Sequence, residues 1–279
     1  MRQFNRVVIL GSGGFISNAL EEILKKKKIK YLALKRKKLD LAKKSSTSVL
    51  VKILKKMDCV IIIAAKAPCK NIRMLEYNLQ IMRNIINALL KKKVRKVIYL
   101  SSDAVYSDSM NKISEKSNTS PKNFHGIMHL MREKMLTSIK PNNLCILRPT
   151  LVYGVNDPHN GYGPNSFLRL AKKNFPIKIF GNGEELRDHV HINDVAKVIF
   201  GSISKNIVGI LNIVTGTKIS FLQIAKLSIK NSNSNSKIIK IKRTIPMPHN
   251  GYRLFNATKI KKIFKEIKLV NIKYNKYFK

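Results

Sequence analysis

A glycine-rich turn directly after the first apolar run constrains the fold of this chain more than any other feature. Four strand-like residues, Val7 to Leu10, lead into Gly11-Ser12-Gly13-Gly14, and a helical segment starts at Phe15. Glycines allow a tight turn and let backbone N–H groups approach a diphosphate at a helix N-terminus, where the helix dipole favours an anion. At the first strand-to-helix turn of a βα series, this arrangement predicts a dinucleotide site, with an ordinary glycine-rich turn as the alternative.

The first half of the chain alternates short β-branched runs with longer amphipathic stretches, which predicts a parallel sheet covered by helices. The expected strands are 6–10, 30–34, 59–64, 96–101 and 144–147, and the expected helices are 15–26, 46–56, 75–92 and 127–139. We therefore expect an α/β fold with a Rossmann-type, doubly wound parallel sheet as the dinucleotide-binding domain over residues 1–150. Glycine- and proline-rich loops then indicate a smaller α/β lobe over residues 151–279, mainly for substrate binding, with part of this later chain returning to the first domain.

The net charge of +40 is the most unusual bulk property of the chain, with 55 Lys and Arg against 15 Asp and Glu. Such a charge suggests a nucleic acid or an anionic membrane as partner. The lysines are nevertheless spread over the whole chain, without aromatic or arginine-rich interleaving, which is typical of solvated faces. We therefore expect neither a membrane nor a nucleic-acid partner.

The longest apolar run, 60–65, stops at Lys66 and is far shorter than the roughly 20 residues of a membrane span. The first residues show no signal-peptide pattern, so a cytoplasmic location is expected. Cys59, Cys69 and Cys145 match neither a disulfide framework nor a zinc spacing, and we expect them to be core thiols.

The end of the second expected strand indicates which dinucleotide is bound. An Asp or Glu at this point would accept a hydrogen bond from the 2′-hydroxyl of NAD, but the chain reads Leu34-Lys35-Arg36-Lys37-Lys38. Two cations there suit a 2′-phosphate, so NADP is expected in preference to NAD. The alternative is that Lys35 and Arg36 merely belong to the general lysine excess.

Further motifs follow in order along nearly the whole chain: Ala64-Ala65, Asn78, then Ser101-Ser102-Asp103-Ala104-Val105-Tyr106, then Arg148-Pro149-Thr150-Leu151-Val152-Tyr153-Gly154, and Gly181-Asn182-Gly183 before Arg187-Asp188. Together they resemble the NAD-dependent epimerase/dehydratase family of extended short-chain dehydrogenases. The resemblance implies a nucleotide-diphosphate sugar as substrate and NADP or NAD as cofactor.

The residues and the resemblance together give the expected site. The cofactor-binding residues are Gly11, Gly13, Gly14, Phe15, Ile16, Lys35, Arg36, Asp40, Leu41, Ala64, Ala65, Asn78, Ser101, His129, Pro149 and Leu151. The substrate-binding residues are Ser102, Asn165, Arg187 and Arg253. Arg187, and after it Arg253, are expected to hold the diphosphate, because a guanidinium matches phosphate oxygens in a bidentate manner.

The chain departs from the family at the catalytic Tyr-x-x-x-Lys pair, because the matching place reads His125-Gly126-Ile127-Met128-His129. An imidazole has an ordinary pKa near 6.5, so His125 is expected to exchange a proton near neutral pH. Ser102 would hydrogen-bond the sugar hydroxyl, with Asp103 beside it, and His129 would hold the ribose. The alternatives are a site that has lost its chemistry and a metal bound by the two histidines.

Ala104 stands where the dehydratases of the family carry Glu, which disfavours a dehydratase. The expected function is an NAD(P)-dependent nucleotide-sugar epimerase or ketosugar reductase that exchanges a hydride at a sugar carbon. A catalytically silent dinucleotide-binding protein and an RNA-associated relative are the alternatives. The resemblance also implies a homodimer through helices 75–92 and 127–139, which both carry apolar stripes.

Overall fold

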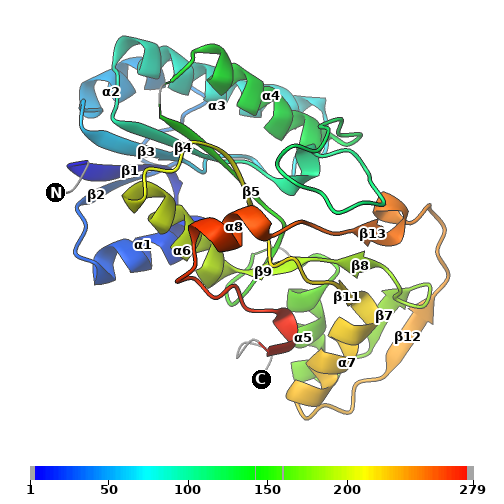
Figure 1. Cartoon of the computed structure of the whole chain (residues 1–279). Coiled ribbons are helices and arrows are strands. Elements are labelled where there is room, and N and C mark those ends of the chain that lie inside the picture. Colours follow the sequence, from blue (N-terminus) through cyan, green and yellow to red (C-terminus); the bar gives the residue numbers. More distant parts are fainter. Residues whose placement is uncertain (1–3, 142, 159, 275–279) are drawn as a thin grey trace. The chain divides into compact units, whose positions relative to one another are not determined.

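The fold is described from a computed structural model, which covers residues 4–141, 143–158 and 160–274 (Figure 1). The chain forms two units. Unit 1 comprises Met1–Ser107, Ser117–Pro149 and Ala196–Asn212, and unit 2 comprises Asp108–Lys116, Thr150–Val195 and Ile213–Lys279. Each unit is described by itself.

Unit 1 is built on a six-stranded sheet in the order β10-β5-β4-β3-β1-β2. Its strands are β1 Arg6–Ser12, β2 Tyr31–Lys35, β3 Asp58–Ile62, β4 Lys96–Leu100, β5 Leu144–Pro149 and β10 Gly209–Ile213. The pairings from β2 through β5 are all parallel. The chain moves in opposite directions along the sheet on either side of β1 and β3, and this reversal creates the crevice in which such folds bind ligands.

Helices cover both faces of this sheet (Figure 1). They are α1 Phe15–Lys26, α2 Ser46–Ile53, α3 Ile72–Lys91, α4 Phe124–Ser138 and α6 Ile192–Ser204. Helices α2, α3 and α4 lie on one face, and α1 and α6 lie on the other. Every residue of β3 and β4 is buried, as the continuous β-branched runs predict for strands covered on both sides. The predicted doubly wound α/β fold is confirmed.

Unit 2 contains short strands and helices around a smaller apolar core. The strands are β6 Leu151–Tyr153, β7 Ile177–Phe180, β8 Leu186–Arg187, β9 His189–His191, β11 Ile219–Ser220, β12 Ile238–Ile241 and β13 Tyr252–Arg253. The helices are α5 Pro164–Lys172, α7 Phe221–Asn231 and α8 Thr258–Ile263. Helix α7 starts with a capping box, in which the side chains of Ser220 and Gln223 each bond the other residue's backbone N–H.

Residues 108–116 belong to unit 2 and not to the first domain, where the sequence placed them. Ile113 forms a bridge with Phe255, and the Asp108 carboxylate lies 2.5 Å from Nδ1 of His249. These partners are about 140 residues away in sequence, so no local pattern identifies the contact. The three cysteines are all buried and free, as predicted.

His189 is a packing residue of unit 2 whose imidazole lacks polar partners. The residue is only 3% exposed, and neither ring nitrogen has a hydrogen-bond partner among the described residues. The ring packs edge-on against Phe221, with centroids 6.0 Å apart. Burial, followed by the nearby Arg187 charge, lowers the pKa of His189 to about 3.

We therefore predict that His189→Phe stabilises the protein by about 1–3 kcal/mol, because the aromatic packing stays and two unsatisfied nitrogens are removed. The unfolded chain binds a proton at His189 below about pH 6.5 while the folded chain does not, so acidification destabilises the wild type. The advantage of the variant in the free energy of unfolding should therefore grow as the pH falls from 6.5 to 4. Urea titrations at several pH values measure it, with His189→Ala as the control that removes the packing. A variant less stable than the wild type would contradict the prediction.

Candidate active site

The glycine turn of unit 1 is held against the end of β3. Gly11 and Gly13 have φ values of +98° and +91°, which favour glycine. A Cβ atom on Gly11 would lie 2.4 Å from the backbone of Ala64, so a side chain has no room there. The turn ends at Gly14, and Phe15 and Ile16 then open the twelve-residue helix α1.

The predicted 2′-phosphate residues lie at the end of β2. Lys35 is exposed, and its side chain lies 3.6 Å from where a Cβ of Gly13 would stand. The Arg36 side chain is 72% exposed; its Nε lies 3.6 Å from the Asp40 carboxylate and its guanidinium 5.4 Å from the Tyr77 ring centre. Hydrogen bonds from the Ala42 N–H and the Tyr77 hydroxyl lower the pKa of Asp40, so Arg36 faces a carboxylate that remains charged. Leu41, in contrast, is part of the buried core.

Asn78 fixes the chain as it leaves β3 through Ala64 and Ala65. Its Oδ1 accepts from the Lys66 N–H at 2.8 Å, and its Nδ2 donates to the carbonyls of Lys66 and Met74. Asn78 is completely buried. The Asn78 amide therefore positions the loop after β3. Asn78 would affect a cofactor only indirectly, by holding the backbone of this loop in place.

Ser101 is also engaged inside unit 1. Its hydroxyl donates to Glu133 at 2.5 Å, and Glu133 accepts two further hydrogen bonds from the Arg148 guanidinium. Pro149 follows at the buried end of β5. Ser101, Arg148 and Glu133 thus join β4, β5 and α4 beneath the surface.

Ser102 and Asp103 follow β4 at the carboxyl edge of the sheet. The Ser102 hydroxyl accepts from the Ala104 N–H at 3.2 Å and donates to Asp103 at 3.4 Å. Ser102 is half-buried, and Asp103 is buried. The serine therefore caps the short turn that follows and retains partial exposure.

Gly126 brings the first turn of α4 onto this segment. A Cβ atom on Gly126 would lie 2.1 Å from the Ala104 carbonyl oxygen and 2.5 Å from Cβ of Pro121. The glycine therefore lets the backbones of α4 and of the segment after Ser102 approach closely. The negative charge of Asp103 acts on the neighbouring His125 imidazole.

His125 and His129 stand one turn apart on α4, with ring centres 4.7 Å apart and planes nearly perpendicular. The Cys69 N–H points at Nδ1 of His125 at 3.5 Å, and the Tyr99 hydroxyl lies 2.8 Å from Nδ1 of His129. Burial raises the pKa of Tyr99, so its hydroxyl keeps its proton, and its bond to Nδ1 of His129 forms with either tautomer of that ring. Nδ1 of His125 accepts from the Cys69 N–H, so a neutral His125 carries its proton on Nε2.

Burial lowers the pKa of both imidazoles. For His125 the charge of Asp103 partly opposes this effect. For His129 the pKa falls well below 6.5, because the positive charges of His125, when protonated, and of Arg132 add to burial. His129 is thus neutral at pH 7.

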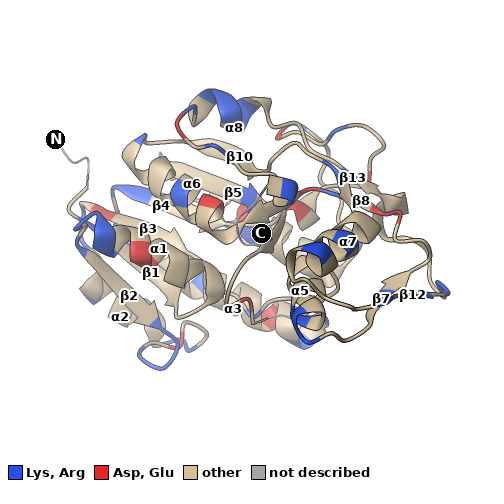
Figure 2. Cartoon of the chain, turned by 90° about the horizontal axis from the view of Figure 1, so that it is seen from below, with Lys and Arg blue, Asp and Glu red and all other residues tan. Residues whose placement is uncertain are grey.

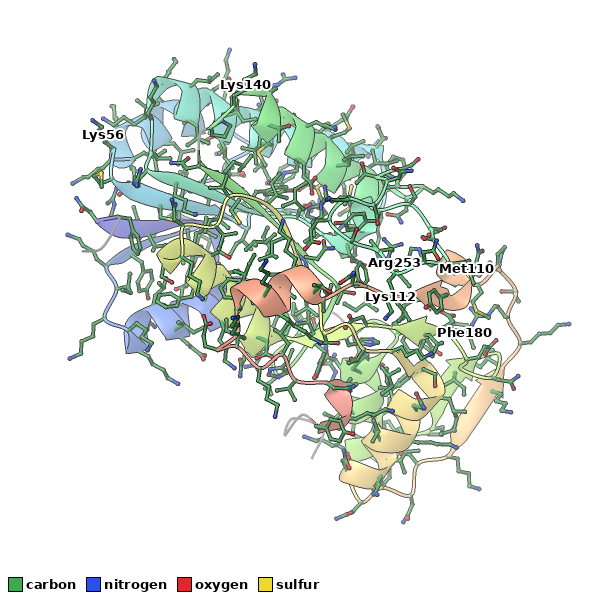
Figure 3. The ribbon with its side chains drawn as sticks, in the orientation of Figure 1. Lys56, Met110, Lys112, Lys140, Phe180 and Arg253 are labelled. Atoms are coloured by element: carbon green, nitrogen blue, oxygen red, sulfur yellow. The ribbon has the colours of Figure 1, made fainter. Side chains whose placement is uncertain are left out.

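The predicted diphosphate residues lie in unit 2, on two neighbouring strands. β13 pairs with β8 so that Arg253 stands opposite Arg187. Arg187 donates to Glu185 and to the Pro248 carbonyl, both at 2.7 Å. Arg253, which Figure 3 labels, lies 3.6 Å from Asp108. The two guanidinium groups are buried and already paired, so a ligand would share them with these acids.

The remaining expected residues of unit 2 differ in exposure. Asn165 is buried; it accepts from the Gly154 N–H at 3.1 Å and donates to Asp157 at 2.6 Å, and it thereby shapes a loop. Leu151 is 43% exposed. Throughout residues 4–141, 143–158 and 160–274, no three His, Cys, Asp or Glu side chains gather in a group suited to a metal ion.

Residues 7–213 match the family model described as "NAD dependent epimerase/dehydratase family". The chain is a member of this family.

Individual relatives are distant. The "Uncharacterized UDP-glucose epimerase YtcB" of Bacillus subtilis (strain 168) is 28% identical over 159 residues, which are 54% of this chain and 49% of that protein. The chain thus spans about half the length of this relative. Two solved structures share the fold: the UDP-N-acetylglucosamine 4-epimerase from Methanobrevibacter ruminantium M1 in complex with UDP-N-acetylmuramic acid (TM-score 0.83, 21% identity, 99% of this chain and 96% of that one) and a GDP-L-fucose synthetase from Naegleria fowleri bound to NADP (TM-score 0.83, 17% identity, 98% and 92%).

Two surface properties bear on partners of this family member. Lys and Arg are distributed over helices and strand ends of each unit (Figure 2). Among the helices of the described residues, none combines the length and apolarity needed to cross a membrane. The apolar stripe of α3 was expected to form the dimer interface, but four of its residues are already buried within the single chain: Leu75, Met82, Ile86 and Leu89. The homodimer stays a prediction, and its interface would have to use other residues.

Three residues important to this site were not singled out from the sequence. Cys69 and Tyr99 orient the two imidazoles, and Gly126 permits the close approach of α4. The glycine between the two histidines was the available signal, because a glycine inside a helix often marks a close contact. The partners of the imidazoles come from β4 and from the loop after β3, and no local pattern identifies them.

We predict that Gly126→Ala destabilises the protein by about 1–3 kcal/mol or more, because the new methyl group meets backbone that cannot yield without moving the helix. Gly161→Ala is the matched control, since nothing lies within 4 Å of its Cβ position. Chemical unfolding of both variants measures the effect. Equal stability of the two variants would show that the approach of α4 is not as close as described.

Proposed function

We propose that this protein is an NADP-preferring nucleotide-sugar oxidoreductase, a ketosugar reductase or an epimerase, that exchanges a hydride with a sugar carbon. The observation that carries the proposal is the contact at Gly126, which sets α4 with His125 against the segment that carries Ser102 and Asp103. The Ser102 hydroxyl and the His125 imidazole thereby lie at the carboxyl edge of the sheet, where the glycine turn also follows β1.

The residues of unit 1 fit a dinucleotide. Gly11 and Gly13 place no side chain between the turn and an approaching diphosphate, and helix α1 begins directly after the turn with its N-terminal dipole. A nicotinamide dinucleotide would supply or accept the hydride. Lys35 and the exposed Arg36 would contact a 2′-phosphate. Residues 34–38 contain no Asp or Glu as the usual partner of a free 2′-hydroxyl, and the nearby Asp40 carboxylate faces Arg36.

Ser102 and His125 would act on the oxygen of the reacting carbon. In the reductive direction, Ser102 donates a hydrogen bond to the ketone oxygen, and protonated His125 gives its Nε2 proton to that oxygen as the carbon gains the hydride. In the oxidative direction, the His125 tautomer with its ring proton on Nδ1 would take the hydroxyl proton at Nε2 as the hydride leaves. His129 is neutral, and its Nε2 would hydrogen-bond a ribose hydroxyl.

Arg187 and Arg253 of unit 2 would bind the diphosphate of the sugar nucleotide. They stand opposite each other on β8 and β13, and a diphosphate matches two adjacent guanidinium groups. The solved relatives named above are a UDP-sugar epimerase and a GDP-sugar synthetase, which supports a nucleoside-diphosphate sugar without choosing the base.

A catalytically silent binding protein is the second candidate, and the contacts of His125 favour it. For Nε2 to accept a proton, the other ring proton must sit on Nδ1, where it would face the Cys69 N–H. The dinucleotide site does not depend on this exchange. Binding without turnover would therefore identify the second candidate.

We predict that NADPH binds more tightly than NADH and that Arg36→Asp reverses the preference, because the carboxylate would repel the 2′-phosphate. Fluorescence titration with both cofactors measures the two affinities. Lys52→Asp, the same charge change at an exposed residue of α2, should leave the preference unchanged. Tighter binding of NADH by the wild type would refute NADP preference.

We predict that His125→Phe lowers kcat by about 10²- to 10⁴-fold, because proton transfer is lost. Cofactor affinity should be nearly unchanged, because the glycine turn stays intact. For reduction, kcat/KM of the wild type should fall as the pH rises through a pKa below 6.5, since burial favours neutral His125 and only the protonated ring donates. For oxidation it should rise over the same range. Full activity of His125→Phe would remove this residue from the mechanism.

A further inference from the structure

Arg132 is a buried cation without a carboxylate partner in the part of the chain that the structure describes. The residue is 1% exposed and lies one turn after His129 on α4. Its guanidinium donates to the Ala64 carbonyl at 2.7 Å and contacts the Met128 sulfur at 3.7 Å. The neighbouring Glu133 is bound to Arg148 and Ser101. The charge of Arg132 is therefore balanced by dipoles alone.

A buried charge of this kind is expensive unless a functional site requires it, because desolvation of an ion costs several kcal/mol. An arginine does not escape the cost by losing its proton. The ring of Tyr99 compensates in part, since the Arg132 guanidinium carbon lies 5.1 Å from its centre. The structure thus keeps a permanent positive charge next to Ala64, where β3 meets the Gly11 turn.

Tyr99 connects this charge to His129. Its ring contacts Arg132, and its hydroxyl bonds Nδ1 of His129 at 2.8 Å. Residues 129 and 132 are three apart on one helix and therefore share a face. A second positive charge at position 129 would face Arg132 in an interior that screens charges poorly.

We propose that Arg132 is the fixed positive charge of this site, and that positions 129 and 132 together hold a single buried cation. His129 is consequently neutral and is oriented by Tyr99, and Arg132 is a positioning residue that acts through Tyr99 and through the Ala64 carbonyl. Its effect on cofactor binding rests on the function proposed above, whereas the exclusion of a second cation does not.

A double-mutant cycle on the full chain tests the exclusion. His129→Lys should lower Tm by several degrees more than His129→Gln, which changes the side chain without adding charge. Arg132→Met should destabilise the wild type but restore Tm in the His129→Lys background by at least about 3 °C relative to additivity. Additive effects would overturn the proposal.

A measurement on the wild type covers the case in which Arg132→Met does not fold. Nitrogen-15 NMR of histidine-labelled protein should show His129 neutral at pH 7, and a protonated His129 would overturn the proposal. If the wild type does not bind NADPH, the proposed function fails, while the stability cycle still decides the role of Arg132.

Discussion

The hydrogen bonds made by the Glu133 carboxylate determine where α4 lies, and the arrangement of the site depends on them. Glu133 accepts from Ser101 at the end of β4 and from both nitrogens that Arg148 of β5 presents to it. Loss of one partner of such a buried pair typically costs about 3–5 kcal/mol, because the other charge remains without compensation. Through this contact the helix that carries both imidazoles is fixed to the two strands whose ends form the site.

The charges of this helix follow from its burial. Glu133 is neutralised by Arg148, His125 and His129 favour their neutral forms, and Arg132 keeps its charge because a guanidinium holds its proton too strongly to lose it. The helix therefore carries two neutral rings and one buried cation. A lysine at position 129 would add a second cation next to Arg132.

The fold was readable from the sequence because its signals are local. Continuous β-branched runs predicted β1 to β5, and the predicted helix 15–26 has the bounds of α1, since the glycine turn fixes its start. β10 and the place of residues 108–116 could not be read, because both depend on pairing with distant segments. The sequence motifs indicated the candidate site residues, but they did not indicate which groups these residues contact. Ser101 and Asn78 hold neighbouring protein groups, and the partners of His125 and His129 come from other elements.

Hydride transfer between a nicotinamide and a sugar carbon is the activity that we propose for this site. The most direct measurement is mass spectrometry of ketosugar nucleotides of UDP and GDP after incubation with NADPH that carries deuterium at both C4 positions. We expect one deuterium atom on a ring carbon of the sugar, incorporated at a rate proportional to the protein concentration. Saturable NADPH binding with no deuterium in any sugar would contradict it and would identify a binding protein.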